Sequence, residues 1–237
     1  MPINLTYDPA TGANYPWTDI SRRPYPEWGV VRLTFPVQRY NSHSLQTAFT
    51  KRFSDGWQAS ATYTVGGLWD AYEAISGTAL VPFTVARDLV GEYSLAGSDQ
   101  RHRAVLNGIW QLRYGFQLSG LYFFGSGERY ATFWGTDLRQ IGVNSGERRL
   151  RKDGTIISRN NFVGKPIHRV DLRVQRRFPL AGRAGIDGIL ELFNVFNHAN
   201  FGKYTLNEVS KTYGQPEQNV NLSYAPRMLQ LGFRVMF

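Results

Sequence analysis

The chain has 237 residues, a formal net charge of +9 and no cysteine, which excludes a disulfide scaffold and a cysteine metal site. No run approaches the roughly 18 consecutive apolar residues of a transmembrane helix, so a helical membrane protein is excluded as well. Transmembrane β-strands escape that test because their apolar and polar residues alternate. The basic charge suits an anionic membrane surface, nucleic acid or a basic lumen.

Residues 1–41 are rich in Pro, Asn, Asp and Gly and predict an irregular, extracellular region of loops or a hairpin. Within it, residues 30–35 form a short strand candidate that Pro36 ends. The first residues, MPINLTYDPATG, contain neither the basic nor the apolar segment of a signal peptide. For an exported protein this predicts that the chain is a fragment of a longer one.

From residue 42 to residue 237 the sequence alternates between apolar and polar residues with the period of two that marks β-strands. Three hairpins are predicted, with short turns at Ser54-Asp55-Gly56, Tyr114-Gly115 and Ala181-Gly182. In the third hairpin Leu172 and Val174 fall on one face, and Asp171 and Arg173 fall on the other. Each predicted strand therefore has an apolar and a polar face.

The last twelve residues predict a further strand, whose apolar face carries Leu229, Leu231, Phe233, Val235 and Phe237. A soluble protein rarely ends on a bare aromatic residue inside a strand, because chain termini fray and gain little from burial. A strand that closes a barrel in lipid is different, since its outer face meets hydrocarbon. The end of the chain therefore favours a membrane barrel.

The connections between hairpins, residues 70–100, 132–165 and 197–225, are much longer than the turns within them. Short turns on one rim and long loops on the other are the layout of an outer-membrane barrel, with periplasmic turns and extracellular loops. The predicted fold class is therefore all-β, an antiparallel transmembrane β-barrel segment of seven or eight strands. Aromatic girdles are predicted at Trp57, Trp110, Tyr114, Phe116, Phe178 and Phe237 on the turn rim, and at Tyr63, Trp69, Tyr122 and Phe124 on the loop rim.

Several segments resemble known outer-membrane families. The set Gln230, Gly232, Val235 and Phe237 resembles the C-terminal assembly signal of bacterial outer-membrane β-barrels, which implies the barrel-assembly machinery as a partner. The hairpin from Ser44-Leu45-Gln46 to Asp55-Gly56 and on to Ala61-Thr62-Tyr63-Thr64 resembles TonB-dependent outer-membrane transporters. The segments 159–164, 170–172 and 176–178, and above all Glu191-Leu192-Phe193-Asn194-Val195-Phe196-Asn197-His198, resemble the Oar-like branch, whose members carry a carboxypeptidase-regulatory-like domain.

This resemblance implies the C-terminal part of a 22-stranded, plugged barrel in the outer membrane, which takes up an unidentified ligand. The plug and the TonB-contacting box are absent, so contact with the TonB complex would come from missing N-terminal parts. No catalysis and no cofactor are implied. Two alternatives remain: a complete small outer-membrane barrel (an adhesin or a barrel enzyme) with residues 30–35 as its eighth strand, and a soluble all-β binding module.

Candidate binding residues are few. The densest basic stretch holds Arg148, Arg149, Arg151 and Lys152, which predict contacts with a loop-bound ligand or with the phosphates of lipopolysaccharide; the alternative is a solvated loop. The histidines His43, His102, His168 and His198 lack metal-type spacing, although His102 and His168 each begin a descending strand. No nucleophile, base and acid are spaced as a catalytic set, and the arginines match no nucleic-acid motif.

Overall fold

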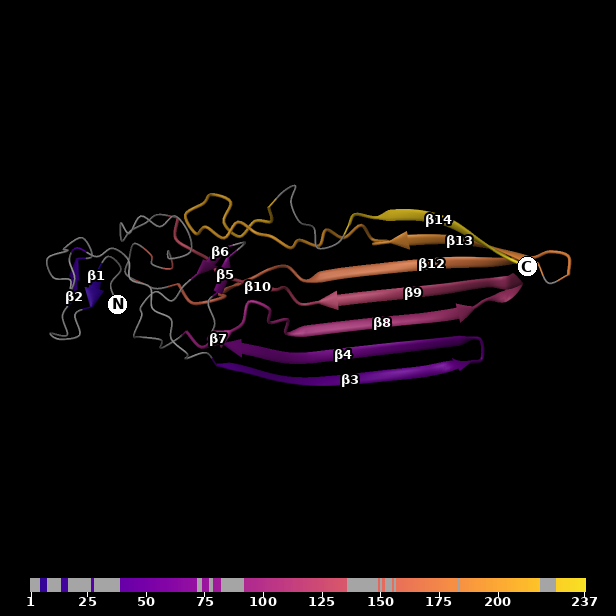
Figure 1. The fold of residues 1–237 in the computed structure, drawn as a ribbon, viewed down its shortest axis with the longest axis horizontal. Coiled ribbons are helices and arrows are strands. Elements are labelled where there is room, and N and C mark those ends of the chain that lie inside the picture. Colours follow the sequence, from indigo (N-terminus) through magenta and orange to yellow (C-terminus); the bar gives the residue numbers. More distant parts are fainter. Residues whose placement is uncertain are drawn as a thin grey trace.

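The computed structural model describes residues 5–7, 14–16, 27, 39–71, 74–76, 79–81, 92–135, 149, 151, 155, 157–182, 184–217 and 225–237. These residues form one large antiparallel sheet and three two-stranded sheets (Figure 1). No helix in this part of the chain is long and apolar enough to cross a membrane.

The large sheet has the strand order β14-β13-β12-β9-β8-β4-β3, with the short strand β7 paired to β4. Its long strands are β3 (Tyr40–Ser54), β4 (Trp57–Asp70), β8 (His102–Gln111), β9 (Phe116–Gly125), β12 (Ile167–Pro179), β13 (Gly185–Phe193) and β14 (Met228–Met236). The other strands are β7 (Ser94–Leu95) and the pairs β1 (Leu5–Tyr7) with β2 (Asn14–Pro16), β5 (Ala74–Ser76) with β6 (Ala79–Val81), and β10 (Arg129–Tyr130) with β11 (Phe162–Val163).

The strand register gathers the predicted apolar residues on one face of this sheet. One row across it reads Trp57, Trp110, Leu118, Val174, Leu190 and Leu231. On β14 this face is open, with Leu231 and Phe233 more than 70% exposed. Large apolar side chains are left uncovered in this way when lipid, and not protein, is their solvent.

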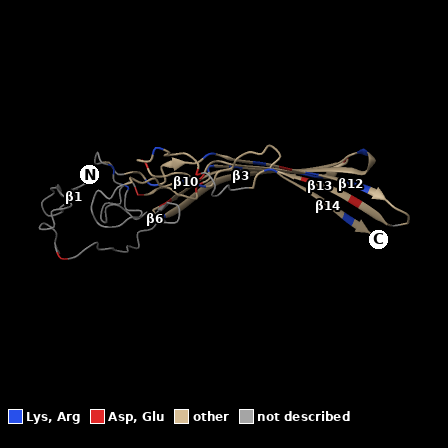
Figure 2. Ribbon diagram, turned by 90° about the horizontal axis from the view of Figure 1, so that it is seen from above, with Lys and Arg blue, Asp and Glu red and all other residues tan. Residues whose placement is uncertain are grey.

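The opposite face is polar. One of its rows reads Ile109, Ser119, Arg173, Glu191 and Gln230, and Asp187 lies between Arg177 and Arg234 in another. Figure 2 shows the basic segments of β12 and β14 on either side of the acidic segment of β13. Both predicted faces are therefore confirmed. In a membrane barrel the polar face lines the lumen.

The hairpin turns all lie at one end of the sheet, together with the C-terminus, and the long connections lie at the other (Figure 1). The first turn needs a positive φ at two residues, Asp55 at 52° and Gly56 at 81°, and the second has Tyr114 at 60° and Gly115 at 75°. Two consecutive positive φ values match the twist of a hairpin. The first hairpin closes in the two residues Asp55 and Gly56, whereas residues 112–115 connect β8 and β9 in the second. Glycine supplies one of the two positive-φ residues in each of these turns.

The protein core lies at the loop end and not within the sheet. Its buried apolar side chains include Ala96, Ala131, Ile157, Tyr204 and Leu206, all from the connections between hairpins. The predicted structureless loops thus carry β7, β10 and β11 and pack together as a loop layer, which we define as the described parts of residues 71–101, 126–166 and 194–227.

One predicted strand boundary differs from the structure, and one predicted strand lies outside the described residues. β3 begins at Tyr40, two residues before the predicted start at residue 42. The strand candidate at residues 30–35 lies outside the described residues. Within the described part of the chain, β3 and β14 each pair on one side only, so the sheet is open at both edges.

Candidate functional site on the polar face and in the loop layer

A hollow of about 470 Å³ opens on the polar face near the turn end of the sheet. Its lining includes three glutamines and three arginines: Gln111, Gln117, Gln175, Arg173, Arg177 and Arg234. These side chains come from β8, β9, β12 and β14, and the period of two brings them to the same face. The hollow is therefore a hydrogen-bonding surface with an excess of donors.

Asp187 positions three of the side chains that line this hollow. Its carboxylate is fully covered and accepts hydrogen bonds from Arg234 Nη2 at 2.5 Å, Gln175 Nε2 at 2.8 Å and Arg177 Nε at 3.1 Å. Both arginine side chains remain 56% exposed. One carboxylate thus fixes two guanidinium groups that still reach the lumen, and the triad keeps a net positive charge.

The same face carries further charge pairs towards the loop end. Arg169 Nη2 lies 2.7 Å from Asp171 Oδ2, and Arg173 Nη1 lies 3.8 Å from Glu191 Oε1. Asp171 also accepts a hydrogen bond from the backbone N–H of Asn194, where β13 ends. Charges of both signs therefore continue along the lumen wall, each held by neighbours on the same face.

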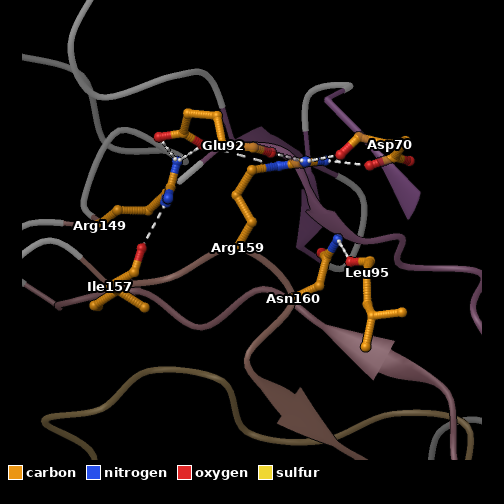
Figure 3. A network of polar contacts seen from close by, with 7 residues as sticks. All are labelled: Asp70, Glu92, Leu95, Arg149, Ile157, Arg159 and Asn160. Atoms are coloured by element: carbon orange, nitrogen blue, oxygen red, sulfur yellow. Dashed lines mark hydrogen bonds and ion pairs between the residues drawn. The ribbon is translucent and has the colours of Figure 1, made fainter. Parts of the chain in front are cut away.

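In the loop layer, Arg159 is the centre of a buried ionic network (Figure 3). Its side chain is 1% exposed, with Nη2 at 2.7 Å from Asp70 Oδ1 and Nη1 donating to the backbone carbonyl of Glu92. The Glu92 carboxylate in turn receives both its hydrogen bonds from Arg149 Nη1, which lies 2.8 Å from Oε2. Asn160 joins the same network by donating to the Leu95 carbonyl at 2.9 Å. The network thereby joins Asp70 at the end of β4 and Glu92 before β7 to Arg149 and Arg159.

A second ionic contact joins the connection before β14 to the other segments of the loop layer. Glu208 accepts hydrogen bonds from Arg151 Nε at 2.6 Å and from Thr132 Oγ1 at 2.8 Å. Burial raises the pKa of the Glu208 carboxyl, but the hydrogen bonds from Arg151 and Thr132 outweigh burial and hold this pKa below its ordinary value. Glu208 is therefore ionised at neutral pH. It joins three chain segments: its own, that of Arg151 and that of Thr132.

An aromatic cluster fills the space between these ionic contacts. The rings of Tyr130, Phe162, Tyr204 and Tyr213 lie with neighbouring centroids 5.2 to 6.3 Å apart. The Tyr204 hydroxyl accepts a hydrogen bond from the Lys165 backbone N–H at 2.7 Å. Burial raises the pKa of both the Tyr130 and the Tyr204 phenol, so both stay neutral. This cluster packs the loop layer as an apolar core does.

The predicted assembly-signal residues all lie on or beside β14. Gln230 and Gly232 pair with Glu191 and Ile189 on the polar face, whereas Val235 pairs with Ile186 on the apolar face. Phe237 follows the strand and is fully exposed. The structure thus shows an alternating strand that ends on an open aromatic residue, and its role in assembly stays a prediction.

The structure describes two of the four predicted basic contacts; Arg148 and Lys152 lie outside the described residues. Arg149 is 2% exposed, and its guanidinium donates hydrogen bonds to the Glu92 carboxylate and to the Ile157 carbonyl. Arg151 is one third exposed and pairs with Glu208. Contact with lipopolysaccharide stays a prediction here, and both described arginines already bind carboxylates of other loops.

The histidines lie at the loop end of the sheet. His102 and His168 are on the apolar face, and each contacts a tyrosine of the neighbouring strand, Tyr63 and Tyr122 respectively. They are not neighbours of each other; His168 instead contacts the ring of His198. Among the described residues no three His, Cys, Asp or Glu side chains lie close enough to hold a metal ion.

The partners of Asp187 and Arg159 were missed by sequence reasoning. Alternation placed Asp187 on the polar face, but Arg234 lies 47 residues further along the chain. Arg159 lies in a loop without periodicity, 89 residues along the chain from Asp70 at the end of β4. A buried charge in a loop has no local sequence signal, so only the folded chain reveals these pairs.

Comparison with known proteins gives one match. A family model described as an outer membrane beta barrel domain matches residues 1–157 and 152–230. No curated protein and no solved structure matches the chain. The two-faced sheet, the turns at one end and the loops at the other agree with this family. The chain therefore belongs to the outer membrane beta barrel domain family and is an integral β-barrel protein of the outer membrane.

Proposed function

We propose that the chain is the C-terminal barrel portion of a TonB-dependent transporter of the Oar-like branch, which takes up an unidentified ligand across the outer membrane. The observation that carries the proposal is the hollowed polar face, where Arg173, Arg177 and Arg234 line a lumen surface with three glutamines. A barrel that only anchors a protein has no need of such a surface. A transporter uses it to hold polar groups inside the barrel.

The open edges of the sheet support a barrel larger than the described strands. In lipid, each unsatisfied backbone group of β3 and β14 costs several kcal/mol, so both edges have to pair. Further strands of a longer polypeptide would close the barrel and widen its lumen. The TonB complex would then act on N-terminal parts, and the barrel-assembly machinery on the strand that ends at Phe237.

The loop layer supports ligand capture at the outer end. Its ionic contacts and aromatic cluster hold the described loop segments in one packed unit at the loop end of the sheet. Rigid loops lose less conformational entropy on binding than mobile ones, which favours affinity. The loops would bind the ligand first, and the lumen would receive it.

The test uses the full-length gene product, purified from outer membranes, with the periplasmic domain of TonB as bait. We expect the full-length protein to bind this domain and to lose binding when its N-terminal TonB-contacting segment is deleted. A heat-modifiable barrel with the mass of this chain alone, and with no affinity for TonB, would instead show a complete small outer-membrane barrel. That second candidate requires residues 30–35 to close the sheet between β3 and β14.

A further inference from the structure

The apolar face of the sheet carries no carboxylate. The structure describes every residue of the long strands, and their four acidic residues, Asp70, Asp171, Asp187 and Glu191, all lie on the polar face by register. Apart from tyrosines, the titratable side chains of the long strands that lie on the apolar face are basic. At its turn end, Lys51 lies over the Trp57 ring and Arg176 over Phe116. The lipid-facing surface is therefore complementary to anions.

At the loop end, two histidines repeat the same arrangement. Tyr63 Oη and His102 Nδ1 lie 2.8 Å apart across β4 and β8, and Tyr122 Oη and His168 Nδ1 lie 3.1 Å apart across β9 and β12. The ring planes meet at 20° in one pair and 24° in the other. Each histidine lies near the start of the second strand of its pair, diagonally opposite the tyrosine. The two pairs form one recurring element on the lipid-facing side.

The hydrogen bond determines what each imidazole can offer. A phenol O–H that donates to Nδ1 leaves the proton of the neutral ring on Nε2, so Nε2–H is free to donate to another acceptor. Such a donor carries no net charge, which lowers the cost of placing it beside hydrocarbon. When Tyr63 and Tyr122 are the donors in these two hydrogen bonds, both histidines present Nε2–H as a donor on this face.

One guanidinium and two further imidazoles lie beside these pairs. Arg101 is exposed, and its Nη1 lies 3.1 Å from the place where a Cβ of Gly67 would be, next to the Trp69 ring on the apolar face. His43 contacts the same Trp69 ring, and His198 contacts His168 with the ring centroids 5.2 Å apart. We call His43, Arg101, His102, His168 and His198 the histidine rim.

The histidine rim lies towards the outer boundary of the hydrocarbon. His102 pairs with Val65, eight residues along β4 from Trp57, and His168 lies six residues along β12 from Val174 of the Trp57 row. At about 3.3 Å per residue these are about 26 and about 20 Å along the strands, which a tilt of about 40° reduces to about 20 and about 15 Å of height within an apolar band of about 25 Å. With the Trp57 row at the boundary of the turn end, the histidine rim thus lies beyond the midplane, on the side of the loops. Since long loops are extracellular, the histidine rim faces the outer leaflet.

We propose that the histidine rim binds the phosphate groups of the glycolipid that forms the outer leaflet. Phosphate oxygens are strong acceptors, and the histidine rim offers N–H donors and a guanidinium on a face without carboxylates. The site is distinct from the basic loop at residues 148–152. It rests on membership of the outer-membrane family and on orientation, and it does not depend on transport.

The test measures binding of lipid A by native mass spectrometry of the full-length protein in detergent. The probes are lipid A with both phosphates and the same lipid after enzymatic dephosphorylation. The variant His102→Phe/His168→Phe keeps an aromatic ring at each position and removes the donors, and Arg176→Gln at the turn end is the control. We expect the double variant to bind phosphorylated lipid A at least about tenfold more weakly, with the control unchanged. Equal affinity of the unsubstituted protein for the two probes, or full affinity in the double variant, would overturn the proposal.

A milder pair of substitutions covers the case in which the double histidine variant does not assemble. Tyr63→Phe/Tyr122→Phe removes only the two hydroxyls that fix the imidazole tautomer. Assembly is checked by heat-modifiable migration in a gel. We expect this variant to assemble and to discriminate less between phosphorylated and dephosphorylated lipid A, and unchanged discrimination would contradict the role given to the Tyr–His pairs.

Discussion

At the scale of single residues, Asp187 is the side chain on which most of the polar face depends. Two arginines and a glutamine from two neighbouring strands point their donors at its carboxylate. Removing a buried countercharge leaves its cationic partners side by side, which is more damaging than removing an exposed one.

We therefore predict that Asp187→Asn lowers the temperature at which the barrel loses its heat-modifiable migration, because Arg177 and Arg234 then repel each other. Glu191→Gln is the matched control on the same strand and face, since its contact with Arg173 is longer, at 3.8 Å, and its carboxylate is more exposed than that of Asp187. The measurement is gel migration after heating at graded temperatures. A loss in the control as large as in Asp187→Asn would contradict the role given to the triad.

Glu208 gives a prediction for pH. Its folded-state pKa lies below the ordinary value of 4.5, so its stabilising contribution is complete above that pH and is lost as pH falls through the folded-state pKa. We expect the loop layer to become more sensitive to pepsin as pH falls below about 4.5. Glu208→Gln should be more sensitive than the unsubstituted protein above this range, should converge with it at lower pH, and should lose this part of the pH dependence.

The control is Glu217→Gln, because Glu217 pairs with Lys203 at the surface, where both side chains are about one third exposed or more. This variant should keep the pH profile of the unsubstituted protein. Identical profiles for the protein with and without Glu208 would show that another carboxyl governs the loops.

At the scale of elements, alternation predicted the sheet well because the period of two is imposed by strand geometry itself. It placed Leu172 and Arg173 on opposite faces, as the register now shows. Turn chemistry was predicted less completely: Asp55 and Tyr114 adopt positive φ, which depends on the twist of the whole hairpin. The loop layer escaped prediction because its contacts join residues 57 to 89 positions apart.

The two faces of β12 can be tested with neighbouring residues. Leu172→Arg should impair assembly, because an arginine on the lipid face near the midplane costs about 2–4 kcal/mol. Arg173→Leu faces the lumen and should assemble nearly normally. The amount of heat-modifiable protein in outer-membrane fractions measures both. Equal damage from the two substitutions would argue for a sheet that protein covers on both faces.

At the scale of the whole molecule, the sheet and the loop layer depend on different forces. Lipid covers the apolar face of the sheet, whereas buried ion pairs and aromatic packing hold the loops. A substitution in the loop network should therefore loosen the loops and leave the sheet in place.

Arg159→Leu should show this separation. It leaves the partly buried carboxylate of Asp70 without the buried guanidinium, and breaking a fully buried pair costs about 3–5 kcal/mol, which sets the upper limit here. We expect trypsin to cut the loops faster, while heat-modifiable migration of the barrel stays unchanged. Lys203→Leu, which breaks only a surface pair, should change neither property, and joint loss of loops and barrel in Arg159→Leu would show that the two parts are not independent.

The orientation of the barrel in the outer membrane is tested most directly by single cysteines, since the chain itself has none. Lys211→Cys lies in the connection between β13 and β14, and Ala181→Cys lies in the turn between β12 and β13. The measurement is labelling by a membrane-impermeant maleimide on intact cells and after the outer membrane is opened. We predict that Lys211→Cys is labelled on intact cells and that Ala181→Cys is labelled only after opening. Labelling of Ala181→Cys alone on intact cells would contradict the proposed orientation, with extracellular loops and periplasmic turns.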